Sequence, residues 1–254
     1  MDILTSKENG ILTITFNRPD KKNAITAAMY QTMADALKDA ENNVEVRAIL
    51  ITGKPEIFTA GNDLDDFLQN PPQSTKSPVY QFIQNLSHAN KPVVAAVSGP
   101  AVGIGTTLLL HCDFVYAADN ARFSMPFAKL GLCPECASSI LLPQIAGYQR
   151  AAEKLLLGEA FSAQEAYAMG FVNKVLPPAE VLAFAQAQAA KLVALPTSSL
   201  RATKRLMKGK QIAAVEAKIK EESVLFSEML LSKEAKEAFT AFFEKRKPDF
   251  TKFK

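Results

Sequence analysis

The stretch KPVVAAVSGPAVGIG, residues 91–105, decides the fold. Its apolar run Val93–Val97 is typical of a strand buried on both faces of a parallel sheet. The following glycines predict a turn, and an apolar helix is expected from about Thr106 to His111. The first N–H groups of a helix have no intrahelical partner, so the Ile104 N–H is a candidate donor to a developing oxyanion. Close packing of strand and helix is the other use for these glycines.

A second glycine-containing turn, FTAGNDL at residues 58–64, could also offer a backbone N–H group to a ligand. Gly61 lets the backbone bend and lets a ligand approach the N–H of Ala60. Asn62 or Asp63 can instead cap the helix that follows. One N–H from each turn, those of Ala60 and Ile104, would form an oxyanion hole.

Outward from these turns, strands alternate with helices. Strands are predicted at 3–5, 11–16, 46–52, 113–117 and 121–124, and helices at 26–42, 79–89, 147–157, 162–169 and 178–194. Residues 129–139 are predicted to be irregular, and the polar, Pro-rich segment 69–78 to be a loop over a ligand site. This order predicts an α/β core over residues 1–196 and a helical region over residues 197–254. The helical region needs a surface to pack on, either a neighbouring subunit or its own core.

Composition excludes several classes of protein. The 254 residues carry 29 basic and 26 acidic side chains, which argues against a nucleic-acid or membrane-surface protein. With two histidines and no HExxH pattern, no metal site is predicted. The pair Cys133 and Cys136 lacks a second pair or a thioredoxin-like context, and two buried small residues are expected there. The three cysteines and the start MDILTSKENG, which shows no secretory pattern, predict a cytoplasmic location.

The two turns closely resemble the signature stretches of the crotonase (enoyl-CoA hydratase/isomerase) superfamily. Further matching landmarks lie along essentially the whole chain, at Asn17-Arg18-Pro19, Lys22-Asn23-Ala24, Cys112-Asp113 and Phe243-Glu244-Lys245-Arg246-Lys247-Pro248. The resemblance implies a spiral of ββα units with a C-terminal α-helical trimerisation region, assembled as a homotrimer or a dimer of trimers. It also implies an acyl-CoA substrate whose thioester carbonyl lies between the N–H groups of Ala60 and Ile104. The residues implied to line the thioester and pantetheine are Ala60, Gly61, Asn62, Asp63 and Leu64.

The resemblance to the superfamily does not by itself identify the residue that carries the proton, because members of this superfamily catalyse many different reactions. Hydratases of the family carry two glutamates, at positions that correspond here to Thr107 and Phe127. Glu135, in the segment GLCPECASS, resembles the single catalytic glutamate of peroxisomal-type Δ3,Δ2-enoyl-CoA isomerases. Its apolar neighbours predict a raised pKa, which suits a base that later acts as an acid. A salt-bridged or exposed loop glutamate is the alternative.

These features lead to the hypothesis of a Δ3,Δ2-enoyl-CoA isomerase of fatty-acid β-oxidation with Glu135 as its proton carrier. No cofactor is expected, since CoA is part of the substrate. The alternatives are another crotonase-type acyl-CoA enzyme, such as a hydratase or thioesterase, or a non-catalytic acyl-CoA- or RNA-binding relative.

Overall fold

The strands form two sheets in the computed structural model, which describes residues 1–69 and 76–253. The larger sheet has six strands in the order β1-β2-β3-β4-β6-β9, and every pair except β1 with β2 is parallel. Its strands are β1 (Ile3–Glu8), β2 (Ile11–Phe16), β3 (Ala48–Thr52), β4 (Val93–Val97), β6 (Phe114–Ala118) and β9 (Lys174–Leu176). The smaller sheet has three, in the order β5 (Pro100–Val102), β7 (Arg122–Ser124) and β8 (Phe161–Ser162).

The chain passes repeatedly from the large sheet to the small one. β5 follows β4 at once, and β7 follows β6, so each turn of the chain adds one strand to each sheet. The segment after β3 joins the pattern, because Thr59 pairs in parallel with Ala101 at the outer edge of β5. This is the spiral arrangement that the sequence resemblance predicts.

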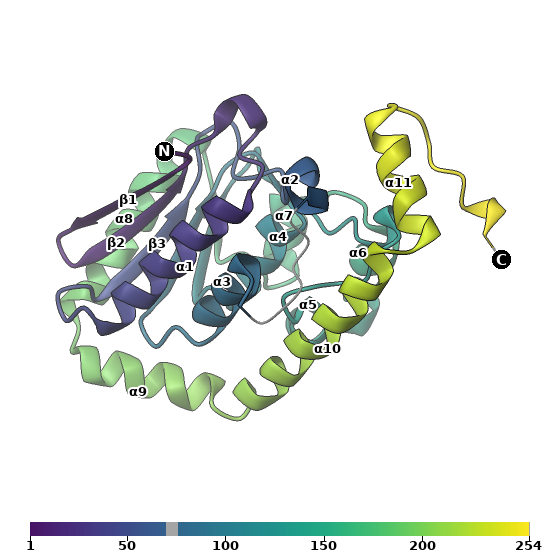
Figure 1. The fold of residues 1–254 in the computed structure, drawn as a ribbon. Helices are drawn as coiled ribbons and strands as arrows, with labels where there is room; N and C mark the ends of the chain where they lie inside the picture. Colours follow the sequence, from purple (N-terminus) through teal and green to yellow (C-terminus); the bar gives the residue numbers. More distant parts are fainter. Residues whose placement is uncertain (70–75, 254) are drawn as a thin grey trace.

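Helices cover both faces of the large sheet (Figure 1). On one face α8 (Pro178–Ala194) packs on residues such as Leu50 of β3. On the other face lie α1 (Ala27–Asn42), whose N-cap is Thr26, and α3 (Pro78–Ser87), which pack against each other. Ile49 and Ile51 of β3 point into this second layer. The strand is therefore buried on both faces, as its continuous apolar run predicts.

The remaining helices before residue 197 are short. They are α2 (Leu64–Gln69), α4 (Ile104–Thr107), α5 (Ser138–Ala146), α6 (Tyr148–Leu157) and α7 (Ala163–Ala168), with 3-10 turns at Pro19–Lys21, Leu108–His111, Ala128–Leu130 and Phe250–Lys252. Among the described residues, no helix is long and apolar enough to cross a membrane.

The C-terminal part of the chain consists of α9 (Thr197–Lys208), α10 (Ile212–Leu230) and α11 (Lys233–Phe243). In Figure 1, α9 runs along the base of the molecule, and α10 and α11 rise on the side away from the β1–β2 hairpin. α10 contacts α3 and α5, so this helix closes one side of the core. The face of α10 that is buried in this way carries Val215, Ile219, Glu222, Phe226 and Leu230.

Several elements differ from the sequence predictions. β1 runs on to Glu8, so the hairpin turn is only Asn9-Gly10, both with positive φ. Residues 138–146, for which no helix is predicted, form α5 with Pro143 inside it. The short strands β8 and β9 also have no local signal, since they form by pairing with β7 and β6. Of the predicted loop 69–78, residues 70–75 lie outside the described residues.

Candidate active site

The two turns that the sequence selects lie side by side and in register. Thr59 pairs in parallel with Ala101, and the Val102 N–H donates to the Thr59 carbonyl at 3.0 Å. Asn62 lies three residues after Thr59, and Ile104 lies three residues after Ala101. The two residues therefore occupy equivalent positions in the two turns. A Cβ on Gly61, where φ is +86°, would lie 2.7 Å from the Val102 carbonyl oxygen. Glycine is therefore what allows the turns to approach this closely.

The structure corrects which N–H group of the first turn is free. The Ala60 N–H donates to the Lys22 carbonyl at 3.0 Å, and the Gly61 N–H donates to the Thr59 hydroxyl at 3.1 Å. The N–H groups of Asn62 and Ile104 have no hydrogen-bond partner among the residues that the structure describes. The prediction of Ala60 as a donor therefore does not fit its backbone hydrogen bonds. Asn62 and Ile104 supply the two unpaired donors, one at the end of each matched turn.

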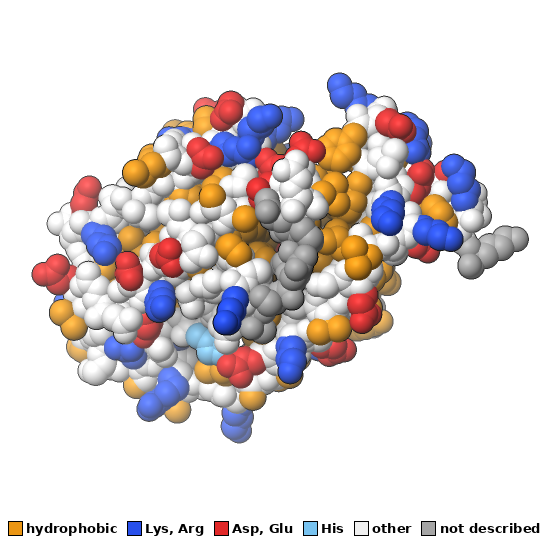
Figure 2. All heavy atoms as spheres, in the orientation of Figure 1, with side chains coloured by type: hydrophobic (Ala, Val, Ile, Leu, Met, Phe, Trp, Pro, Cys, Tyr) orange, Lys and Arg blue, Asp and Glu red, His pale blue; other side chains and the backbone are white. Residues whose placement is uncertain are grey.

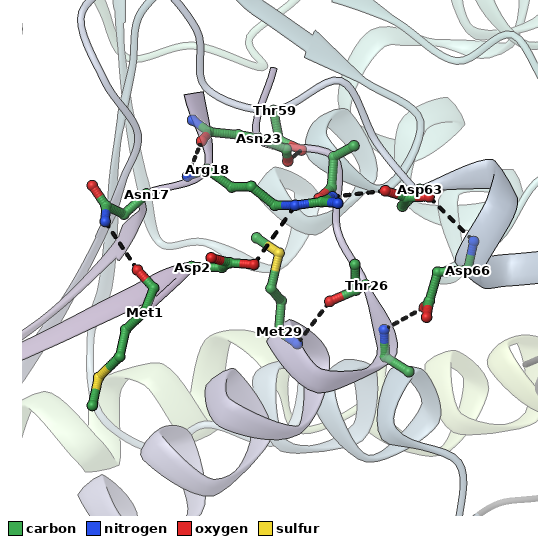
Figure 3. Close-up of polar contacts among 12 residues, drawn as sticks. Met1, Asp2, Asn17, Arg18, Asn23, Thr26, Met29, Thr59, Asp63 and Asp66 are labelled. Carbon is green, nitrogen blue, oxygen red and sulfur yellow. Dashed lines mark hydrogen bonds and ion pairs between the residues drawn. The ribbon is translucent and has the colours of Figure 1, made fainter. Parts of the chain in front are cut away.

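Polar contacts hold the first turn in place. Figure 3 shows Arg18 lying between Asp2 and Asp63, and its Nη1 is 2.7 Å from Asp63 Oδ2. The amide of Asn23 donates to the carbonyls of Ile57 and Phe58, at 3.1 and 3.0 Å. Arg18 and Asn23, two of the landmark residues, thus serve to shape the turn.

The other predicted turn residues are placed as follows. The Asp63 carboxylate is directed at Arg18 and accepts from the Asp66 N–H at 3.2 Å, so it fixes the start of α2. The Asn62 side-chain oxygen accepts from the Tyr30 hydroxyl of α1. Leu64 is the first residue of α2 and packs against the core. In this chain the side chains of Asn62, Asp63 and Leu64 are engaged with the protein itself.

Glu135 lies in the wall of an apolar cavity of about 400 Å³. Its side chain is buried, and its Oε1 has no hydrogen-bond partner among the described residues. The cavity lies between α2, α3 and α10, and the apolar residues that line it include Phe67, Val79, Tyr80, Ile83 and Phe226. Figure 2 shows hydrophobic side chains gathered between the body of the molecule and the C-terminal helices. A buried polar atom without a partner at the edge of a cavity is positioned to act on a ligand.

The surroundings of Glu135 disfavour its charged form. Burial, followed by the nearby charge of Glu222, raises the pKa of the Glu135 carboxyl to about 8. The raised pKa that its apolar sequence context predicts is thereby confirmed. Such a carboxyl accepts and returns a proton near neutral pH.

Two neighbouring side chains, Tyr30 and Cys136, lie between Glu135 and the turns, although neither Asn62 nor Ile104 is among the described residues that line the cavity. Tyr30, which donates to Asn62, is fully buried, and its pKa is raised first by burial and then by the charge of Glu135. On the other side, burial raises the pKa of Cys136, and the nearby Thr107 hydroxyl of α4 acts in the opposite direction. Thr107 lies beside Cys136 but makes no hydrogen bond of ordinary geometry with a described residue. The carboxyl and both donor turns therefore converge on one region.

Comparison with known proteins decides the family. Residues 6–253 match the model of the enoyl-CoA hydratase/isomerase family. The chain belongs to this family. Enoyl-CoA delta isomerase 2 of Rattus norvegicus is 38% identical over 97% of this chain, which spans only 64% of that relative. The 1,2-epoxyphenylacetyl-CoA isomerase of Escherichia coli is 34% identical, over 98% of both chains.

A solved structure agrees with this assignment. The crystal structure of an enoyl-CoA hydratase/isomerase from Pseudoalteromonas atlantica T6c superposes with a TM-score of 0.95. It is 41% identical and covers 98% of this chain and 100% of its own. The crotonase-type spiral with C-terminal helices is therefore the fold of this protein, and the family places it among crotonase-type acyl-CoA enzymes.

The two positions that the sequence resemblance matches to the glutamates of hydratases hold neutral residues here. Thr107 is fully buried in α4, and Phe127 is buried with its ring 6.5 Å from that of Phe226. Phe226 also lines the cavity beside Glu135. Glu135 is thus the buried carboxyl in the cavity wall, which also includes Glu228, and neither Thr107 nor Phe127 adds a carboxylate.

Cys133 is half-buried and Cys136 is buried, and both are free thiols. Burial raises the pKa of Cys133 to about 11 and that of Cys136 well above its usual value, so both thiols are protonated near neutral pH. No group of three metal-ligating side chains occurs within residues 1–69 and 76–253.

Sequence reasoning missed Asn62 as a donor, Tyr30 and Glu222. A backbone donor leaves no mark in a sequence, because its availability depends on pairing with a distant segment. Glu222 did leave a signal, since it is the charged residue in the apolar stripe of α10 between Ile219 and Phe226. A charged side chain in such a stripe is buried on folding, so it needs a hydrogen-bond or ion-pair partner in the core.

Proposed function

We propose that this protein is a Δ3,Δ2-enoyl-CoA isomerase that moves the double bond of a 3-enoyl-CoA to the trans-2 position. The observation that carries the proposal is the buried, unpartnered carboxyl of Glu135 at the edge of an apolar cavity. A one-base proton shuttle needs this arrangement, because the same group must first take up a proton and then release it.

In this mechanism the N–H groups of Asn62 and Ile104 donate to the thioester oxygen of the bound substrate. Their donation makes the C2 proton more acidic, and ionised Glu135 removes it. The resulting dienolate places its charge on the thioester oxygen, where the two donors stabilise it by a few kcal/mol, on the order of 3. Protonated Glu135 then delivers the proton to C4. Proton transfer and oxyanion stabilisation are sufficient for this reaction, so no cofactor is needed beyond the CoA of the substrate.

The turn from Ala60 to Leu64 is proposed to line the thioester and pantetheine through its backbone. Its side chains at Asn62 and Asp63 are engaged with Tyr30 and Arg18, and the Asn62 N–H is the main-chain donor of this turn that has no partner among the described residues. The apolar cavity between α3 and α10 is proposed to hold the acyl chain, since its walls are mostly hydrophobic.

The proposed assembly is a homotrimer or a dimer of trimers built through residues 197–254. Large apolar side chains are exposed on this region, including Leu206, Met207, Leu231 and Phe242. Exposed apolar side chains of this size favour contact with a partner, and a second copy of the chain is the partner that the family suggests. We also infer a cytoplasmic location, because Cys112, Cys133 and Cys136 are free thiols, as expected in a reducing compartment.

The direct test is to incubate the purified protein with a 3-enoyl-CoA and to follow the conjugated product. A parallel incubation with trans-2-enoyl-CoA measures hydration, and a thiol reagent detects any thioesterase activity. Isomerisation with a specificity constant well above that of hydration supports the proposal. A hydration constant equal to or larger than the isomerisation constant overturns it in favour of a hydratase.

A further inference from the structure

The backbone that carries Glu135 has an unusual conformation. Cys136 and Ala137, the next two residues, both lie in the left-handed region, with φ of +59° and +55°. Non-glycine residues in this region are each disfavoured by about 1 kcal/mol or more, so the surrounding structure must hold them there. The direction of the Glu135 side chain depends on this turn, because the turn begins at its own carbonyl, to which the Ser138 N–H donates at 3.0 Å.

The group that holds this turn is Glu222, from the distant helix α10. Its Oε2 accepts from the Ala137 N–H at 2.6 Å, and its Oε1 accepts from the Ser139 N–H at 3.1 Å and from the Ser139 hydroxyl at 2.5 Å. Ala137 is the N-cap of α5, so the carboxylate also lies at the positive end of that helix. Glu222 is only 5% exposed, and no cation forms an ion pair with it within the described part of the chain.

Glu222 also places a second carboxyl close to Glu135. Burial raises the pKa of Glu222, and the hydrogen bonds from Ser139 and Ala137, followed by the charge of Lys218, favour its ionised form. Burial is the main cause of the raised pKa of Glu135, and the charge of Glu222 is the other. The remaining titratable groups around Glu135 are Tyr30, Cys133 and Cys136, which are neutral near pH 7, and Lys220 and Glu228 in the cavity wall. Glu222 is therefore placed to affect both the position and the proton affinity of the catalytic carboxyl.

We propose that Glu222 is a positioning residue for Glu135, which fixes the left-handed turn at 136–137 by its three hydrogen bonds and places a second carboxylate behind the one that faces the cavity. This inference rests on the proposed function insofar as Glu135 is the proton carrier. Through Glu222, helix α10 affects the position of the proposed proton carrier. Glu222 itself is not expected to contact the substrate.

The test compares Glu222→Gln, Glu222→Ala and the control Glu221→Gln. Glu221 is the preceding residue of α10, pairs with Lys218 and faces solvent, so its replacement makes the same chemical change without touching the turn. Glu222→Gln removes the charge and keeps one acceptor oxygen, which can still accept from Ser139, whereas its NH2 group cannot accept from the Ala137 N–H. The acid limb of kcat/KM is expected to move to lower pH by roughly one unit. Glu222→Ala removes the hydrogen bonds too, and kcat is expected to fall about 100-fold with a smaller change in KM.

A purely structural role predicts a different result. Glu222→Gln would then lower the stability but leave the pH profile superimposed on that of the wild type and of Glu221→Gln, and this outcome overturns the proposal. Glu222→Gln is nearly isosteric, so it remains informative if Glu222→Ala does not fold.

A second measurement separates this inference from the proposed function. The Glu135 carboxyl is titrated directly by ¹³C NMR in protein labelled at the glutamate carboxyl carbons, and Glu135→Gln assigns the signal. A lower titration midpoint in Glu222→Gln supports the role of Glu222 even if the wild type proves not to isomerise 3-enoyl-CoA. An unchanged midpoint refutes it whatever the reaction is.

Discussion

Replacing Glu135 with Gln is expected to stabilise the folded protein while it removes the proposed proton carrier. The carboxyl has a pKa of about 8 in the folded protein, compared with 4.5 for an ordinary glutamate. Because the folded-state pKa is raised, folding favours the protonated form. The protonated Glu135 carboxyl therefore makes its full contribution to the free energy of unfolding below about pH 4. This contribution is lost as the pH rises through about 8.

The magnitude follows from the size of the shift. One pKa unit corresponds to about 1.4 kcal/mol, so ionisation of Glu135 lowers the free energy of unfolding of the wild type by about 3 kcal/mol at pH 7 and about 4 kcal/mol at pH 8. At pH 5 the loss is only about 1 kcal/mol. Glutamine has nearly the same shape and remains neutral, so it escapes this loss. The stability difference between the variant and the wild type should grow with pH.

The assay is urea denaturation of both proteins at pH 5 and pH 8, at one protein concentration because assembly affects apparent stability. The exposed Glu221→Gln is the matched control and should differ from the wild type by less than about 0.5 kcal/mol at both pH values. A Glu135→Gln variant that is no more stable than the wild type at pH 8, or a difference that is the same at both pH values, refutes the reasoning.

Further predictions concern activity and assembly. The kcat/KM of isomerisation should fall about tenfold per pH unit below pH 8, because only ionised Glu135 accepts the C2 proton, and Glu135→Gln should reduce kcat by about 100-fold or more while acyl-CoA still binds. A pH-independent rate between pH 6 and 8 contradicts this assignment. Gly61→Ala should lower the free energy of unfolding by about 2 kcal/mol and impair turnover, since the new Cβ meets the Val102 carbonyl at 2.7 Å; unchanged denaturation and kinetics contradict it. Cys133→Ala and Cys136→Ala should each retain most activity, and loss of turnover together with loss of bound zinc overturns that expectation. Light scattering should show a trimer or a multiple of it, and a stable monomer at micromolar concentration argues against the role given to residues 197–254.

The side-chain carboxyl and the backbone N–H donors of the candidate site were not equally predictable from the sequence. Glu135 was selected by its resemblance to the single glutamate of Δ3,Δ2-enoyl-CoA isomerases, and its apolar neighbours added only the expectation of a raised pKa. The donor pair was found only in part. Ile104 was predicted correctly as an unpaired N–H, since it begins a helix after a glycine turn and helix starts leave N–H groups free.

The sequence by itself determined the longer elements and the family resemblance. The apolar run of β3 is typical of a strand buried on both faces, Thr26 marks the start of α1, and the resemblance singles out Glu135 as the candidate carboxyl. The tertiary structure alone decided that Asn62 and not Ala60 offers the free N–H, because Lys22 occupies the Ala60 donor. It also decided that Glu222 holds the turn behind Glu135, across 85 residues of chain. Local patterns depend on neighbours within a few residues, whereas pairing of a donor or a buried carboxylate depends on segments that only folding brings together.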